Sequence, residues 1–201
     1  MLETVVQTTD AVISLIGLPG SGKSTVGRQL ARRLNLPFID SDAEIEKRLG
    51  CSIRDYFERQ GEAGFRDVEQ AVVADLCAAS STAAAAVLST GGGTVLREAN
   101  RAALRASGHV VYLHSSPNDV FKRLRHDRKR PLLQVDDPLQ RLRDLYAERD
   151  PLYRETAHYV VETGRPSAAA LVNTIVMQLE LAGVNLMTAK APDSGKPNGP
   201  G

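Results

Sequence analysis

The sequence predicts a single α/β domain with a mostly parallel β-sheet that is covered by helices on both faces. The order of segments along the chain indicates this fold class. Short apolar runs with strand character alternate with segments whose apolar residues recur at the helical period. An alternation of this kind is typical of parallel sheets. Such sheets bind their ligands at the carboxyl ends of the strands, so we expect a site at that edge.

Five short runs rich in apolar residues are expected to form the strands. They cover residues 11–16, 37–40, 87–90, 109–114 and 159–161. The third run is followed directly by Gly91, Gly92 and Gly93. Three consecutive glycines extend neither a strand nor a helix cheaply, so we expect a tight turn of the backbone there.

The helices are expected between these runs. In residues 23–34, Val26, Leu30 and Leu34 lie on one face and form an apolar stripe. Capping signals and periodicity predict further helices over residues 41–50, 52–60, 65–79, 138–149 and 167–181, and one that begins at Pro117.

Particular residues mark the expected helix ends. Ser41 and Glu44 have the spacing of a capping box, which makes Ser41 the expected N-cap of its helix. Gly50 is expected to end that helix, and Gly61 to end the next one. A proline follows Ser116, and another follows Asp137, which is the usual order of an N-cap and a first helical residue.

Length and composition are those of one globular domain. The chain has 201 residues, of which 42% are hydrophobic and 24% are charged. We expect an N-terminal extension over residues 1–10, a domain over residues 11–185 and a disordered tail over residues 186–201. Cys51 and Cys77 are too few for a disulfide framework or a zinc site, so free thiols in the cytoplasm are expected.

Charge and hydropathy indicate which partners to exclude. Lys and Arg number 25 against 24 Asp and Glu, so no net field favours nucleic acid. No run approaches the roughly 18 apolar residues that a membrane span needs. The first residues, MLET, lack the basic and apolar regions of a secretory signal. We therefore expect no nucleic-acid partner and no membrane partner.

A glycine-rich loop follows the first strand and precedes the first helix. Residues 17–24, GLPGSGKS, fit the phosphate-binding pattern G-x-x-x-x-G-K-[ST]. Its backbone N–H groups and the helix N-terminus favour phosphate, Lys23 would bridge the β- and γ-phosphates, and the Ser24 hydroxyl would hold Mg²⁺. The loop thus predicts ATP and Mg²⁺ as cofactors, bound by Gly20, Ser21, Gly22, Lys23, Ser24 and Thr25.

Two carboxylates leave the second strand. Asp40 and Asp42 are expected to face the same edge of the sheet as Lys23. One carboxylate could accept or orient the proton of an acceptor hydroxyl, and the other could serve Mg²⁺ through its waters. Ordinary helix capping also explains acidic residues at this place, and the sequence leaves that alternative open.

Two further motifs suit an anionic acceptor. In residues 61–66, GEAGFR, Arg66 lies at an expected helix start, where its charge opposes the helix dipole. That position indicates an anionic ligand, but an ion pair with Glu62 or Glu69 would satisfy Arg66 equally well. The amides of the glycine triplet at residues 91–93 suit a small polar ligand, and a purely structural turn is the alternative.

Residues 122–133, KRLRHDRKRPLL, form the densest basic cluster. No aromatic residues lie between these charges, which argues against nucleic-acid binding. An arginine-bearing lid over ATP explains the cluster better, because closure excludes water and an arginine can neutralise charge on the transferred phosphoryl group. A solvated helical face is the alternative for Lys122, Arg125, Arg128 and Lys129.

Taken together, these motifs resemble those of the shikimate kinases over roughly residues 11–180. The more specific elements are the segments 62–66, 90–93, 130–133 and 149–153. The resemblance implies a three-layer P-loop nucleoside-triphosphate hydrolase fold with five parallel strands in the order 2-3-1-4-5. It also implies a substrate-binding segment near residues 42–75 and a lid near residues 122–137.

The resemblance further implies roles for residues around the acceptor. Asp42 would bind the hydroxyls of shikimate and act as the base or orient the reacting hydroxyl. Arg66 and Arg149 would clasp the substrate carboxylate, since a guanidinium fork matches a carboxylate in two places. Gly91, Gly92 and Gly93 would contact the ring hydroxyls.

On the nucleotide side, the resemblance implies that Asp40 joins Ser24 near Mg²⁺. Arg130 would be the lid arginine that reaches the phosphates, and it completes a catalytic set with Lys23 and Asp42. Other nucleotide contacts would come from Arg123, Arg165 and Pro166.

The function implied is ATP-dependent phosphorylation of the 3-hydroxyl of shikimate, within chorismate and aromatic amino acid biosynthesis, by a cytoplasmic monomer. The motifs also fit another small-metabolite kinase, such as a gluconate kinase, or a nucleoside-monophosphate kinase. A nucleotide-dependent switch protein is a more remote alternative, which leaves Arg66 and Arg149 without a purpose.

Overall fold

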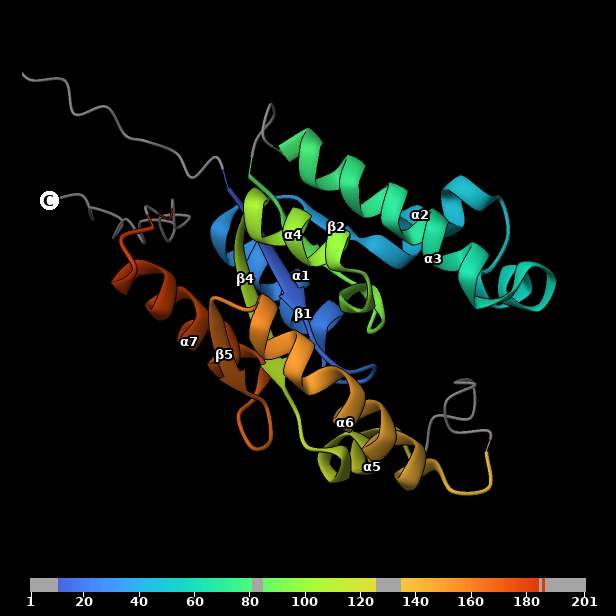
Figure 1. Ribbon diagram of the computed structural model, residues 1–201. Helices are drawn as coiled ribbons and strands as arrows, with labels where there is room; N and C mark the ends of the chain where they lie inside the picture. Colours follow the sequence, from blue (N-terminus) through green and yellow to red (C-terminus); the bar gives the residue numbers. More distant parts are fainter. Residues whose placement is uncertain (1–10, 81–84, 126–134, 185, 187–201) are drawn as a thin grey trace, which may run out of the picture.

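The computed structural model describes residues 11–80, 85–125, 135–184 and 186. At its centre is a five-stranded sheet in which every neighbouring pair of strands is parallel (Figure 1). The strands are β1 (Val12–Ile16), β2 (Phe38–Asp40), β3 (Val87–Ser89), β4 (Gly108–His114) and β5 (Tyr159–Glu162). Their order, β2-β3-β1-β4-β5, confirms the fold class and the strand order expected above.

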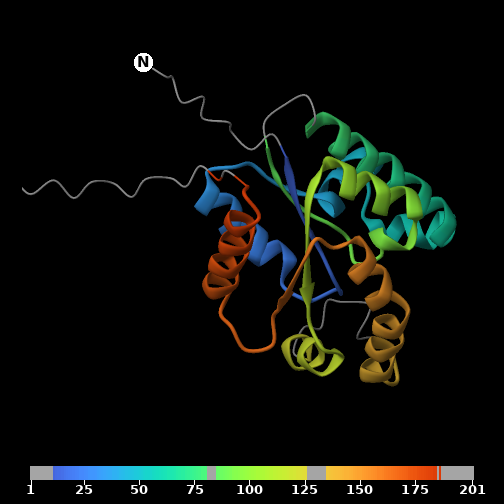
Figure 2. The same cartoon turned by 60° about the vertical axis from the view of Figure 1, so that its left-hand side comes forward.

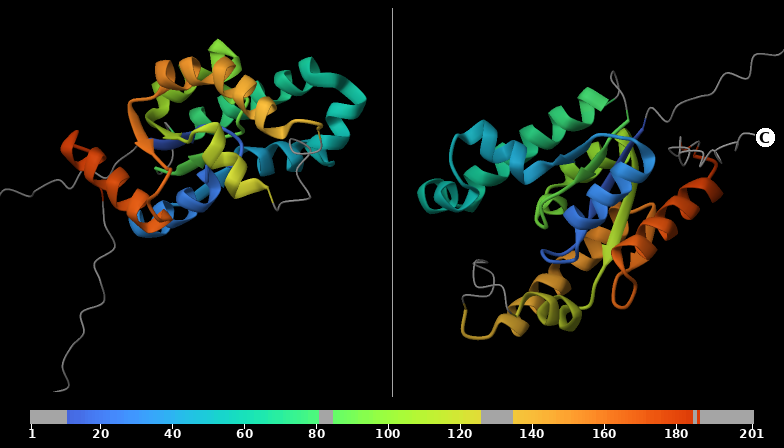
Figure 3. Two further views of the ribbon diagram at one scale, coloured as in Figure 1. Left: turned by 90° about the horizontal axis from the view of Figure 1, so that it is seen from below. Right: turned by 180° about the vertical axis from the view of Figure 1, so that it is seen from behind.

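The helices are distributed over both faces of the sheet. They are α1 (Lys23–Leu34), α2 (Ser41–Leu49), α3 (Ile53–Ser80), the short 3₁₀ helix η1 (Thr94–Leu96), α4 (Glu98–Ser107), α5 (Pro117–Leu124), α6 (Pro138–Thr156) and α7 (Ala168–Leu181). Helices α1 and α7 cover one face, and α3, α4 and α6 cover the other (Figure 2). Two separate helical arms, α2 with α3 and α5 with α6, extend from the sheet (Figure 3).

The central strand shows how the sequence builds these layers. All five residues of β1 are buried, as expected for a strand that is covered on both faces. Because successive side chains point to opposite faces, Ile13 and Leu15 join the core under α1 and α7. Val12 and Ile16 join the second core, under α3, α4 and α6.

The register between neighbouring strands brings the carboxyl ends of β1, β2 and β3 close together. Ser89, the last residue of β3, pairs with Leu15 of β1 on one side and with Asp40 of β2 on the other. The segments that follow β1, β2 and β3 therefore leave the sheet side by side. These segments carry the phosphate loop, the carboxylate pair and the glycine triplet, so the convergence expected from the sequence is confirmed.

The start of α2 differs from the expectation. The N-cap is Asp40, whose side chain accepts a hydrogen bond from the Asp42 amide at 3.2 Å, so the assignment of Ser41 as the cap is wrong. Ser41 is fully buried, and its hydroxyl accepts a hydrogen bond from the Gly91 amide at 3.1 Å. The capping-box spacing considers only neighbouring residues. Here the Ser41 hydroxyl binds the distant Gly91 amide and does not cap the helix.

Helix α3 contains the expected break at Gly61, where φ is 70° and ψ is −178°. The chain re-enters the helix at once, although the sequence indicated a gap until Phe65. Arg66 consequently lies beyond the first turn of the new helical segment. The argument that Arg66 opposes a helix dipole, which acts within the first turn, therefore does not hold.

Helix α6 is longer than expected, and the segment between η1 and β4 contains a helix that the sequence analysis did not identify. The expected end near Arg149 is wrong, because α6 continues through Pro151 to Thr156. Tyr153 and Thr156 are fully buried, and their packing maintains the helix in spite of the hydrogen bond that Pro151 cannot donate. The helix not identified is α4, which buries Asn100 and Leu104.

Several expectations concern residues outside the described part of the chain. They are the extension over residues 1–10, the tail from residue 187 onward, Arg130, and the portion of the expected lid over residues 126–134. Within the described residues, no helix is both long enough and apolar enough to cross a membrane.

Gly61→Ala is expected to lower the free energy of unfolding by about 1–3 kcal/mol, because this region of φ and ψ is accessible essentially only to glycine. Gly64→Ala, three residues later in ordinary helical conformation, is the matched control. A Cβ there would lie 3.3 Å from Cβ of the exposed Gln60, so a small change of stability, within about 0.5 kcal/mol in either direction, is expected. Urea unfolding measures both. Equal stability of the two variants would contradict the backbone geometry at Gly61.

Candidate active site

The loop between β1 and α1 leads the N-terminus of α1 to the cleft. Gly22 is the N-cap of α1, with φ 97°, and it has no side chain that could cap the helix. The first amides of a helix have no intrahelical partner, so those of α1 are available to an anion. At the other end of the loop, Gly17 has φ 143°, and a Cβ there would lie 2.7 Å from the Leu113 carbonyl oxygen. Both glycines are required by the path of the loop.

Lys23 extends along the inside of this loop. Its ammonium donates hydrogen bonds to the carbonyl oxygens of Gly17 at 2.8 Å and Leu18 at 2.9 Å. Only 7% of the residue is exposed, so these carbonyls replace the water that a buried ammonium would otherwise need. The lysine thus holds the loop in shape and remains part of the cleft wall.

Ser24 and Asp40 face each other at the carboxyl edge of the sheet. The Ser24 hydroxyl donates to Asp40 Oδ2 at 3.0 Å and lies 3.4 Å from the Ser89 hydroxyl. A hydroxyl and a carboxylate are the oxygen ligands that suit Mg²⁺. Among the described residues, no group of three or more His, Cys, Asp or Glu could hold a metal ion. A Mg²⁺ ion here would therefore rely on phosphate oxygens and water for its other ligands.

A cleft of about 390 Å³ connects these residues with the carboxylate of α2. Its walls come from the phosphate loop, the end of β2, the end of β3 and α5. The lining residues are Pro19, Gly20, Gly22, Lys23, Ser24, Thr25, Asp40, Asp42, Ser89, Thr90, Gly92 and Leu124. Ser89 was not among the expected site residues, because a small residue at the end of a buried strand carries no distinctive signal.

Asp42 points into the cleft, remains open to it, and carries a perturbed carboxyl group. Crowding by the surrounding protein removes much of its hydration, and the Asp40 carboxylate repels a second negative charge. These two effects raise the pKa of Asp42 to about 6, although Lys23 acts in the opposite direction. Such a pKa is suited to a group that must exchange a proton near neutral pH.

The glycine triplet is a turn whose residues are selected by close packing. None of the three has a positive φ, so conformational freedom is not the reason for glycine. A Cβ on Gly91 would lie 2.7 Å from Asp42 Oδ1, and one on Gly92 would lie 2.6 Å from Pro19 Cδ. A Cβ on Gly93 would collide with the guanidinium of Arg66. The turn is therefore where the phosphate loop, Asp42 and Arg66 meet.

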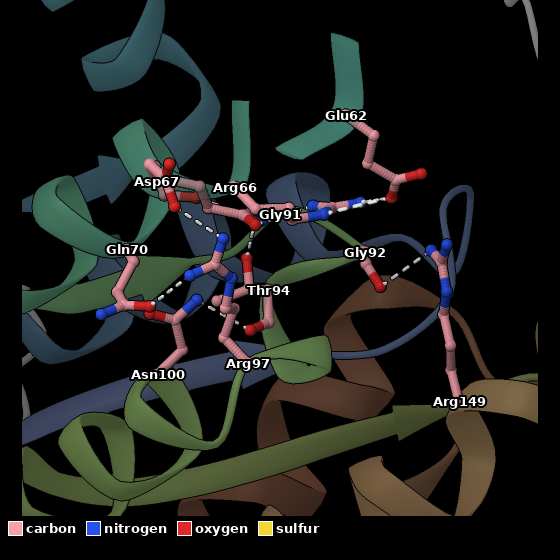
Figure 4. Close-up of polar contacts among 12 residues, drawn as sticks. Glu62, Arg66, Asp67, Gln70, Gly91, Gly92, Thr94, Arg97, Asn100 and Arg149 are labelled. Atoms are coloured by element: carbon pink, nitrogen blue, oxygen red, sulfur yellow. Dashed lines mark hydrogen bonds and ion pairs between the residues drawn. The ribbon is translucent and has the colours of Figure 1, made fainter. Parts of the chain in front are cut away.

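Arg66 is held between two carboxylates. Its Nη1 donates to Glu69 Oε2 at 2.7 Å, and its Nη2 donates to Glu62 Oε1 at 2.9 Å (Figure 4). Both ion pairs that the sequence offered as alternatives are therefore present. The two partners differ in burial, since the side chain of Glu69 is 1% exposed and that of Glu62 is 63% exposed. The sequence named both partners from their spacing to Arg66 along the helix, but it did not show that Glu69 is buried.

Arg149 approaches the same turn from α6. Its Nη1 donates to the Gly92 carbonyl at 3.2 Å, and Tyr153, one helical turn further on, donates its hydroxyl to the same oxygen at 2.5 Å. Figure 4 shows Arg66 and Arg149 reaching the glycine turn from different elements. Tyr153 belongs to the segment 149–153 noted above, but its contact with Gly92 was not expected. The extended α6 is what aligns the two side chains.

A second cavity, of about 250 Å³, adjoins the phosphate loop on the side of β5. Arg123 enters its wall and donates to the carbonyl oxygen of Thr163 and to that of Ser21, the latter at 3.4 Å. Pro166 also lines this cavity, whereas Arg165 is exposed and does not. The cavity shares Gly22 and Thr25 with the main cleft, so one elongated ligand could occupy both.

The fold and the site together define a P-loop phosphotransferase, with an anion-binding loop next to an acceptor region of carboxylates and arginines. Comparison with known proteins identifies the family. The family model described as shikimate kinase matches residues 19–180. The chain belongs to the shikimate kinase family and has the ATP-dependent phosphotransferase activity of that family.

Relatives support this assignment over most of the chain. A shikimate kinase from Paracidovorax citrulli is 61% identical over 173 residues, which are 86% of this chain and 93% of the relative. One from Ralstonia nicotianae is 54% identical over 172 residues, covering 86% and 88% of the two chains. The resemblance inferred from the motifs is therefore confirmed.

Solved structures of related proteins also support the assignment to this family. A shikimate kinase from Acinetobacter baumannii in complex with shikimate is 46% identical, with a TM-score of 0.78 over 86% of this chain and 94% of that one. A gluconokinase from Sinorhizobium meliloti has a TM-score of 0.50 at 20% identity over 88% and 99% of the two chains, which shows a shared fold alone. The family assignment thus decides among the acceptors that the sequence left open.

The pKa of Asp42 is expected to be about 6 in the ligand-free protein, and a carboxyl-detected NMR titration measures it. Asp40→Asn removes the repelling charge, so the pKa of Asp42 is expected to fall toward its ordinary value. Asp55→Asn, at an exposed position of α3 outside the cleft, is the control and is expected to leave it unchanged. No change in the Asp40→Asn variant would contradict the electrostatic coupling between the two aspartates.

Proposed function

We propose that this enzyme binds shikimate in the cleft around the Gly91–Gly93 turn and phosphorylates its 3-hydroxyl. The observation that carries the proposal is the convergence of Asp42, Arg66 and Arg149 on that turn, next to the phosphate loop. The complex of the Acinetobacter baumannii relative with shikimate supports the same acceptor. The reaction then forms a bond between the acceptor oxygen and the γ-phosphorus and breaks the bond from that phosphorus to ADP.

In this proposal, Arg66 and Arg149 clasp the carboxylate of the substrate. The edge of Arg66 formed by Nε and Nη2 contacts a single oxygen of Glu62, at 3.3 and 2.9 Å. Glu62 is mostly exposed and can return to water at little cost, which leaves that edge free to receive a substrate carboxylate. Two parallel hydrogen bonds from one guanidinium edge then give both affinity and orientation.

Asp42 is proposed to accept the proton of the reacting hydroxyl or to orient that hydroxyl for in-line attack. Its raised pKa supports proton exchange near neutral pH, and its position beside Lys23 places it next to the phosphates. The hydroxyls of the acceptor are proposed to contact Asp42 and the backbone of Gly91, Gly92 and Gly93. Positioning of this kind supplies much of the rate of a direct phosphoryl transfer.

The donor is proposed to lie along the phosphate loop, with its phosphates on the amides from Gly20 to Thr25. Lys23 is proposed to neutralise charge on them, and Arg123 and Pro166 to border the base. Arg165 and the lid arginine Arg130 keep the donor-side roles that the family resemblance implies. The contact between the Ser24 hydroxyl and the Asp40 carboxylate supports Mg²⁺ at this position. Ser24 and Asp40 would hold the ion there, and it would supply positive charge that offsets the charge of the phosphates.

We also propose that the enzyme is a cytoplasmic monomer with one catalytic domain over residues 11–185. Cys51 and Cys77 are both free thiols, which suits a reducing compartment. The segment 42–75, comprising α2 and most of α3, is proposed to bind the acceptor, and residues 122–137 to form the lid.

Asp42→Asn is expected to lower kcat by about 100-fold or more, because an amide cannot accept the proton. In the wild type, kcat/KM is expected to fall as the pH drops below about 6, since protonated Asp42 is inactive in this role. A coupled ADP-release assay across this pH range measures both effects. Near-normal turnover of the variant, with ATP binding intact, would remove Asp42 from the reaction.

Arg66→Lys is expected to raise the KM for shikimate by about 10-fold or more, because an ammonium cannot replace the bidentate edge of a guanidinium. The Kd for ATP is expected to stay unchanged. Arg97→Lys is the matched control, since Arg97 pairs with Asp67 and Gln70 away from the cleft. Steady-state kinetics and calorimetric ATP titration provide the two readouts, and equal loss of both ligands in Arg66→Lys would contradict the proposed role.

A further inference from the structure

A buried chain of hydrogen bonds leads from the glycine turn to Arg66. The Thr94 hydroxyl donates to Glu69 Oε1 at 2.9 Å, and Glu69 Oε2 accepts from Arg66 Nη1 at 2.7 Å. The side chain of Glu69 is 1% exposed, and Thr94 is fully buried. Each oxygen of this carboxylate therefore has a different protein partner in a place that water does not reach.

Thr94 is itself fixed at both of its backbone groups. Its amide donates to the Gly91 carbonyl at 3.2 Å, and its carbonyl accepts from the Asn100 side chain at 2.9 Å (Figure 4). The hydroxyl consequently has a defined position at the start of η1, directly after the glycine triplet. Through Glu69, that position is linked to α3, which carries Arg66.

The chemistry of a guanidinium next to a carboxylate shows why this link matters. Left to themselves, an arginine and a carboxylate favour a fork-to-fork pair in which both oxygens accept. In this protein Thr94 donates to Oε1 and fixes the orientation of the carboxylate, and Glu69 engages Arg66 through Oε2 and Nη1. The edge formed by Nε and Nη2 then faces away from Glu69 and contacts the releasable Glu62.

We infer that Thr94 is a positioning residue for the acceptor. By holding one oxygen of Glu69, it keeps Arg66 from rotating into a bidentate pair with that buried carboxylate and leaves the Nε–Nη2 edge for the substrate. This inference rests on the proposed function, in which that edge binds the carboxylate of shikimate. Thr94 does not touch the substrate in this role, and it acts only through Glu69 and Arg66.

The test compares three threonine variants by steady-state kinetics and thermal unfolding. Thr94→Val removes the hydroxyl at nearly constant volume, and Thr94→Ser restores it. Thr156→Val is the matched control, because Thr156 is also fully buried and its hydroxyl donates only to the Leu152 carbonyl of its own helix, at 2.6 Å. Thr94→Ala, which removes the hydroxyl without adding a methyl group, is used if Thr94→Val does not fold.

The KM for shikimate is expected to rise about 10-fold in Thr94→Val, the scale of one hydrogen bond to a charged group, while kcat and the KM for ATP stay within about 2-fold. Thr94→Ser is expected to recover the wild-type KM, and Thr156→Val to retain it whatever its loss of stability. An unchanged KM in Thr94→Val would overturn the inference, as would a serine variant as impaired as the valine variant.

The Arg66→Lys variant distinguishes a failure of the role of Thr94 from a failure of the proposed binding of shikimate by Arg66. A raised KM for shikimate in Arg66→Lys together with a wild-type KM in Thr94→Val overturns only the role of Thr94. A wild-type KM for shikimate in Arg66→Lys overturns the proposed clasp itself.

Discussion

The close approach of side chains to the backbone of Gly91, Gly92 and Gly93 is the constraint on which the rest of the site depends. Asp42, Pro19 and Arg66 each occupy the space that a Cβ on one of these residues would need. Arg149 and Tyr153 converge on the carbonyl of the middle glycine. The turn thus brings the phosphate loop and both helical arms into contact, which a chain with side chains at these positions could not do.

Two cations of the site, Lys23 and Arg66, are paired by the protein itself before any ligand binds. Lys23 is bound to loop carbonyls, and Arg66 lies between Glu62 and Glu69. These pairs remove the cost of buried charges that lack partners. They also separate rigid partners from releasable ones, because Glu69 is buried whereas Glu62 is exposed. In the proposed complex, the substrate carboxylate replaces the exposed partner and leaves the buried one in place.

Local patterns were reliable for strands, for most helix boundaries and for the phosphate loop, because these depend on periodicity and on neighbouring residues. The errors arose where distant segments compete for a residue. Ser41 binds the Gly91 amide and so does not cap α2, and α6 passes through Pro151 because its next turn is buried. The helix-dipole argument for Arg66 failed for a different, local reason, since Gly61 bends α3 without ending it.

The sequence by itself determined the fold class, the phosphate-binding loop and, through the combination of its motifs, the family. These follow from spacing along the chain, which the sequence states directly. Only the tertiary structure decided that Glu69, Thr94 and Tyr153 support the acceptor region, and that Asp42 has a raised pKa. Such properties depend on distances between segments that are far apart in the chain and on the exclusion of water between them. A pattern of residues contains neither quantity until the sheet brings those segments together.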